Sequence, residues 1–219
     1  MSNRLFSTWP GWARKVAKMV VFGLFGVVFG YGVGWLLTAK IFPGAPSPSD
    51  LSLRWSDVLA GLVAFGLVFG AASVLIASLD ARRMGQMYGL EGAASPSEIA
   101  QARLQAFVMG FSGFILVLPV VFSLAGGSPV LGVGIIGLLL VLHTLMNFKV
   151  YRQADELLRR AVLETATATF FLGQGLLFAW AVAERLGVAP PITAWDIYAV
   201  LMTLYLAVSV TVSVRRGLA

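Results

Sequence analysis

The sequence predicts an all-α fold, that of a polytopic membrane protein with six transmembrane helices packed as hairpins. Of its 219 residues, 58% are hydrophobic and only 12% are charged, whereas about 25% of the residues in a soluble domain are charged. Six apolar runs are each long enough to cross a hydrocarbon core about 30 Å thick, because a helix rises about 1.5 Å per residue. The runs lie at about 17–39, 58–79, 104–125, 129–148, 163–184 and 194–214.

The distribution of lysine and arginine predicts the orientation. The gaps on one side carry most of the cations, namely Arg4, Arg14, Lys15, Lys18, Arg82, Arg83, Arg103, Lys149, Arg152, Arg159, Arg160, Arg215 and Arg216. The gaps on the other side carry only Lys40, Arg54 and Arg185. Because cytoplasmic loops are enriched in lysine and arginine, both termini are expected in the cytoplasm. We therefore attribute the net charge of +6 to membrane topology and to contact with anionic lipids, not to nucleic-acid binding.

The chain divides into a short leading segment and the helical domain. Residues 1–16 combine tryptophan with cations, which fits either an interfacial helix or a solvated basic tail. Residues 17–216 form the transmembrane domain. Glycines at four-residue spacing line one face of the first two runs, at Gly26, Gly30, Gly34, Gly66 and Gly70. This spacing predicts close packing of the two helices, with an oligomer seam or a pore lining as the alternatives.

Local signals predict where several helices begin. Residues 95–98 read Ser-Pro-Ser-Glu, a capping box with proline at the first helical position, so the third helix is expected to start at Pro96. No turn residue occurs between 150 and 163, which allows the fourth helix to continue past the membrane and the fifth to begin early. Thr193 and Asp196 resemble a second capping box, before the last helix.

The few strongly polar side chains within the runs are the candidate ligand or proton-responsive residues, because such groups are costly in a bilayer. His143 and Asn147 share one face of the fourth helix, Glu164 lies at the start of the fifth, and Gln174 lies deeper in it. A pair between His143 and Glu164 is geometrically allowed. The pattern fits either a polar site at the cytoplasmic end or ordinary interhelical hydrogen bonds.

The segment 151–160 is the most distinctive cytoplasmic stretch. Asp155 with Arg159, and Glu156 with Arg160, have the i,i+4 spacing of helical ion pairs. These four residues form either a solvated helix surface or a docking face for a partner.

Part of the chain carries a recognisable pattern. Its residues are Asp155-Glu156-Leu157, Arg159-Arg160, Leu163-Glu164-Thr165-Ala166, Glu184, Gly187, Pro190, Trp195 and Arg215-Arg216. In this order, residues 150–216 resemble a two-helix pattern of small alphaproteobacterial inner-membrane proteins, DELxRR, LEAxA, W and RR. Thr165 stands where that pattern has alanine. The resemblance implies a bacterial inner-membrane location, and it implies no activity.

The residue types present exclude several chemistries. The chain has no cysteine and one histidine, so thiolate catalysis, disulfides and a bis-histidine haem are excluded, and no cofactor or metal site is expected. No P-loop or GxSxG motif occurs. We therefore favour a non-enzymatic accessory, assembly or scaffolding subunit that binds other membrane subunits or itself. A small-solute transporter or channel is the alternative. A lipid or quinone site at the tryptophan-rich face of Trp35, Trp55, Trp180 and Trp195 is a third hypothesis.

Overall fold

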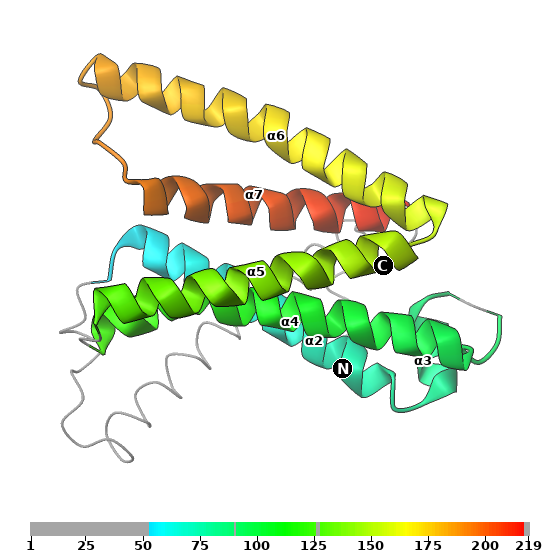
Figure 1. The fold of residues 1–219 in the computed structure, drawn as a ribbon. Coiled ribbons are helices and arrows are strands. Elements are labelled where there is room, and N and C mark those ends of the chain that lie inside the picture. The colour runs from blue at the N-terminus through cyan, green and yellow to red at the C-terminus, as the bar shows by residue number, and fades with distance from the viewer. Residues whose placement is uncertain (1–52, 90, 126–127, 217–219) are drawn as a thin grey trace, which may run out of the picture. The chain divides into compact units, whose positions relative to one another are not determined.

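The computed structural model describes residues 53–89, 91–125 and 128–216, and these residues form helices without any strand (Figure 1). The helices are α2 (Trp55–Ala77), α3 (Ala81–Met87), α4 (Pro96–Leu124), α5 (Pro129–Gln153), α6 (Glu156–Arg185) and α7 (Ala194–Arg215). Five of them, all except α3, are long and apolar enough to cross a membrane. The all-α fold is thus confirmed for these residues, and the five long helices are consistent with an integral membrane protein. The segment 1–16 and the first run, 17–39, lie outside the described residues.

Two predicted helix starts are confirmed at atomic detail. Before α4, the Ser95 backbone N–H donates to Glu98 Oε2 at 2.7 Å, and the Glu98 N–H donates to Ser95 Oγ at 3.3 Å. Before α7, the side chain of Thr193 accepts from the N–H of Asp196, and the Asp196 carboxylate accepts from the N–H of Thr193. These reciprocal bonds satisfy backbone N–H groups that have no partner inside the helix.

The link between α5 and α6 is only two residues long. α5 continues to Gln153 and α6 begins at Glu156, so both helices extend beyond the apolar runs, as the sequence allows. Asp155 is the N-cap of α6, and its Oδ1 accepts the N–H of Leu158 at 2.8 Å. A carboxylate at this position also interacts favourably with the positive end of the helix dipole.

The short helix α3 was not predicted. Asp80 caps it by accepting the N–H of Arg82 at 2.8 Å. Met84 is fully buried and forms a small core with Ala94 and Ala102. This core joins the end of α2 to the start of α4.

The closest helix packing lies between α2 and α4. Ala64 of α2 and Leu116 of α4 are buried together in the main core, with Ala199 of α7. A Cβ atom at Gly113 of α4 would lie only 2.8 Å from the carbonyl oxygen of Ala64. Glycine is therefore what lets the two backbones approach.

The two described glycines of the predicted glycine face contact other helices. A Cβ atom at Gly66 would lie 3.5 Å from Leu206 of α7, and one at Gly70 would lie 3.2 Å from Met109 of α4. The glycines of the first run lie outside the described residues, so packing between the first two runs stays a prediction.

The helices are unequally packed. α2 lies against both α4 and α7, whereas α5 packs mainly against α4, and α6 mainly against α7. The pairs α4–α5 and α6–α7 are hairpins whose helices pack together, as predicted. Much of the surface of α5 and α6 is consequently exposed, and large apolar side chains cover it.

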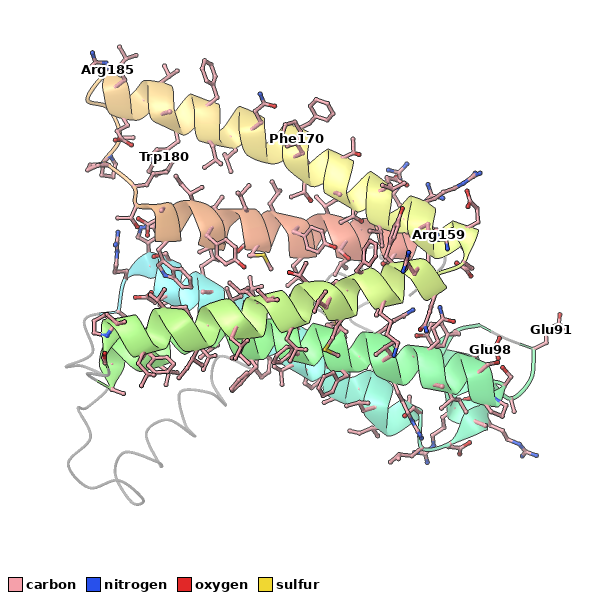
Figure 2. The ribbon with its side chains drawn as sticks, in the orientation of Figure 1. Glu91, Glu98, Arg159, Phe170, Trp180 and Arg185 are labelled. Carbon is pink, nitrogen blue, oxygen red and sulfur yellow. The ribbon has the colours of Figure 1, made fainter. Side chains whose placement is uncertain are left out.

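The ends of the helices define two chemically different ends of this bundle. One end, which we call the arginine end, carries Arg82, Arg83, Arg103, Lys149, Arg152, Arg159, Arg160, Arg215 and Arg216. The other, the tryptophan end, carries Trp55, Trp180 and Trp195. Figure 2 shows Arg159 at the start of α6, and Trp180 and Arg185 toward its other end.

Candidate functional site

A polar cluster joins α4 and α5 through His143. Its Nε2 lies 2.6 Å from the hydroxyl of Ser112 on α4, and the Asn147 amide nitrogen lies 3.2 Å from its Nδ1. The ring also packs against that of Phe111, at 6.0 Å between centroids. The structure thus brings together His143 and Asn147, and it adds Ser112, which the sequence reading did not single out.

The hydrogen bonds indicate which nitrogen of His143 carries the proton. The Ser112 hydroxyl donates to the carbonyl of Val108 at 2.9 Å, so its one hydrogen is used. His143 Nε2 then donates to Ser112. The Asn147 amide nitrogen lies 3.0 Å from Nε2 and 3.2 Å from Nδ1, and with the proton on Nε2 only Nδ1 can accept from it. In this arrangement the imidazole is neutral and both of its ring nitrogens form hydrogen bonds. A neutral, hydrogen-bonded ring suits a helix interface in a bilayer.

Glu164 is separate from this cluster. Its carboxylate accepts from the guanidinium of Arg216 at the end of α7, with Arg216 Nε at 2.8 Å. The pair allowed by the sequence, His143 with Glu164, does not form, because each side chain has a nearer partner on another helix: Ser112 on α4 for the histidine and Arg216 for the glutamate. The role of these residues in binding a ligand or a proton stays a prediction.

Gln174 lies on the outward side of α6. It is exposed and forms no hydrogen bond with any described residue. The opposite side of α6 faces α7, where a Cβ atom at Gly173 would lie 2.6 Å from Leu201. Phe170, labelled on α6 in Figure 2, is likewise exposed. Gln174 thus accompanies aromatic side chains on a surface that no described residue covers.

The predicted ion pair between Asp155 and Arg159 is wrong. Arg159 Nη2 donates to the carbonyl of Arg152 at 3.0 Å, and Nε donates to that of Tyr151 at 3.4 Å. The reason is the abrupt end of α5, whose last carbonyls lack partners within the helix and attract a cationic donor. Asp155 is meanwhile occupied as the cap of α6.

The second predicted ion pair is confirmed. Arg160 Nε lies 2.9 Å from Glu156 Oε1, and both side chains are well exposed. Docking of a partner by Asp155, Glu156, Arg159 and Arg160 stays a prediction.

A cavity of about 450 Å³ opens at the arginine end between α5, α6 and α7. Its wall includes Asn147, Phe148 and Tyr151 of α5, Leu158 and Val162 of α6, and Tyr205 of α7. Asn147 therefore contacts His143 and also lines the cavity. Gln174 is not among the residues that line it.

Sequence reasoning missed a buried ion pair at the tryptophan end. The Asp196 side chain is 1% exposed and lies 2.7 Å from Arg54 Nη2. It also accepts from the Thr193 backbone N–H and hydroxyl, at 2.7 and 2.8 Å. Next to it, Trp195 Nε1 donates to Asp57 at 2.8 Å. These bonds tie the start of α2 to the start of α7, and the capping box at Thr193 was the only signal in the sequence.

The described tryptophans therefore have polar partners or lie at the surface. Trp180 Nε1 donates to the carbonyl of Pro190 at 3.1 Å, and the Trp55 side chain is exposed. Trp35 lies outside the described residues. Among the described residues, no cluster of three or more histidine, aspartate or glutamate side chains could hold a metal ion.

Comparisons with protein families, with curated proteins and with solved structures find no match to this chain.

Proposed function

We propose that this chain is a non-catalytic integral membrane subunit, an accessory or scaffolding component, that associates with another transmembrane helix through the outward face of α6. The observation that carries the proposal is Gln174. It lies near the middle of the apolar run 163–184, where a side chain on the lipid-facing side would meet hydrocarbon. An amide without a hydrogen-bond partner in hydrocarbon costs several kcal/mol.

The neighbours of Gln174 suit a helix–helix contact. Phe170, Phe171 and Phe178 are 63%, 66% and 70% exposed, and they flank Gln174 at helical spacing. A Cβ atom at Gly175 would meet nothing within 4 Å, so a second backbone has room to approach. A partner helix that offers a polar side chain at this depth would satisfy the amide, with a gain of about 0.6–2 kcal/mol.

The location that we propose is a bacterial inner membrane, with both termini in the cytoplasm. The concentration of cations at the arginine end supports this orientation. A reporter enzyme fused near Pro46 should then act as a periplasmic protein. Cytosolic behaviour of that fusion would contradict the orientation while leaving the α6 contact untouched.

The association is tested with the full chain in mild detergent. Size-exclusion chromatography with light scattering should show an oligomer or a stable complex, and Gln174→Leu should weaken it. Thr211→Val on α7 is the matched control, because Thr211 is exposed and its hydroxyl donates to Ala207 of its own helix at 2.8 Å. A wild-type chain that always elutes as a lone monomer would contradict the proposal.

A further inference from the structure

The cavity at the arginine end combines aromatic and apolar walls with a cationic rim. Phe148 forms part of its wall, and the Arg152 guanidinium lies 4.9 Å above the centre of the Phe148 ring. Stacking of this kind holds the charge at the edge of the cavity. Leu158 and Val162 of α6 form the facing apolar wall.

Arg152, the cation at this rim, has no acidic partner among the described residues. It forms no ion pair there, and it is exposed. The carboxylates nearby are already engaged: Asp155 caps α6, Glu156 pairs with Arg160, and Glu164 pairs with Arg216. The charge at the rim is thus free to meet an anion from outside the chain.

The depth of the cavity matches the upper part of one lipid leaflet. On α5 its wall extends from Thr144 to Ala154, which is about 15 Å of helix at about 1.5 Å per residue. The headgroup layer is about 5–8 Å thick on each side of the hydrocarbon core. The apolar run of α5 ends near residue 148, so Arg152 and Tyr151 fall at headgroup depth when this run crosses the hydrocarbon core, whereas Thr144 falls at the depth of the acyl chains.

We propose that this cavity binds an anionic phospholipid. The phosphate lies against Arg152, where the Tyr151 hydroxyl supplies a further donor, and an acyl chain lies against Leu158 and Val162. A free phosphate ion would match only the rim. A zwitterionic lipid has the same phosphate, but the cationic amine of its headgroup repels Arg152 and weakens the attraction. An anionic lipid matches both the rim and the apolar wall, and it joins two helices, α5 and α6, that otherwise meet mainly at their short link.

Native mass spectrometry of the full-length protein in a neutral detergent measures this binding. With mixed micelles that contain phosphatidylglycerol, one lipid should be retained per chain, and less should be retained with phosphatidylcholine. Arg152→Gln should lower the retention of phosphatidylglycerol about fivefold, the effect of one cation near an anionic headgroup. Arg82→Gln is the control, since it removes an exposed cation from α3 at the same end and should change nothing.

A second variant separates the lipid from a bare anion. Val162→Trp fills the apolar wall without changing any charge, and it should also lower retention, while excess inorganic phosphate should not displace the lipid. Circular dichroism checks that each variant is folded, and Arg152→Lys should retain the lipid. Equal retention by Arg152→Gln and Arg82→Gln, full retention by Val162→Trp, or displacement by phosphate would each overturn the proposal.

Discussion

The α2–α4 interface and the outward face of α6 are both apolar. Their small and polar residues differ, because those at the interface contact another helix and those on α6 contact no described residue. At the interface, Gly113 lies against the backbone of Ala64, and Arg103 of α4 donates to the Ser78 carbonyl at the end of α2 at 2.8 Å. On α6, Gly175 has nothing nearby and Gln174 has no partner among the described residues. Apolar length identifies a membrane helix, but small and polar residues identify the face that meets protein.

The largest expected effect on stability is at a packed helix contact, where α2 meets α7. Asp196→Ala should lower the free energy of unfolding by about 3 kcal/mol, because it removes a buried carboxylate that holds Arg54 and caps α7. Chemical denaturation in mild detergent, followed by circular dichroism, measures the loss. Arg54→Met should also be destabilising, since it leaves the buried carboxylate with its Thr193 bonds but without a counter-charge. A loss below about 0.5 kcal/mol for Asp196→Ala would show that the network contributes nothing.

Gly113→Ala should lower the free energy of unfolding by a smaller amount. The new Cβ atom would lie 2.8 Å from the Ala64 carbonyl oxygen, and overpacking of this kind costs about 1–3 kcal/mol. Gly134→Ala on α5 is the matched control, because its Cβ atom would meet nothing within 4 Å. The control should be neutral or slightly stabilising, since alanine favours helix. The same denaturation measurement applies, and equal effects of the two variants would contradict the assigned packing.

Two adjacent arginines at the start of α6 offer a finer test. Arg159→Gln should cost about 1 kcal/mol, because Arg159 covers the last carbonyls of α5. Arg160→Gln should cost only about 0.3–0.5 kcal/mol, the usual value of an exposed i,i+4 pair. Thermal unfolding of both variants in the same detergent should rank them in this order, and the reverse order would refute the capping role.

The smallest stability effect is expected on α6. Gln174→Leu should lower the unfolding free energy of the isolated chain by less than about 0.5 kcal/mol, because no described residue contacts the amide. Denaturation in a detergent that keeps the chain monomeric provides the measurement. A large loss in that monomer would place the partner of Gln174 within this chain, and the α6 face would then be an internal contact.

Much of the fold was predictable because its signals are local. Apolar length predicted the five long helices, and the capping pairs at Ser95 and Thr193 predicted where α4 and α7 begin. The short helix α3 was not predictable in this way. It has seven residues, and its stability comes from burial of Met84 against Ala94 and Ala102.

The candidate site was predictable only in part, because its partners are far apart in the sequence. His143 with Asn147 followed from helical spacing, and that neighbourhood is present in the structure. The bond to Ser112, and the ion pair of Arg54 with Asp196, join residues on different helices. Arg159 illustrates a further limit: i,i+4 spacing predicted Asp155 as its partner, but the end of α5 offered uncapped carbonyls instead.

The central claim is that the outward face of α6 binds another chain. Photocrosslinking in native membranes is the most direct test of it. The chain contains no cysteine, so Gln174→Cys creates a single attachment point for a benzophenone maleimide, and Thr165→Cys, on the buried side of α6, is the control. We predict an intermolecular protein product at position 174 and none at 165. Products confined to lipid or to the same chain at position 174 would contradict the account.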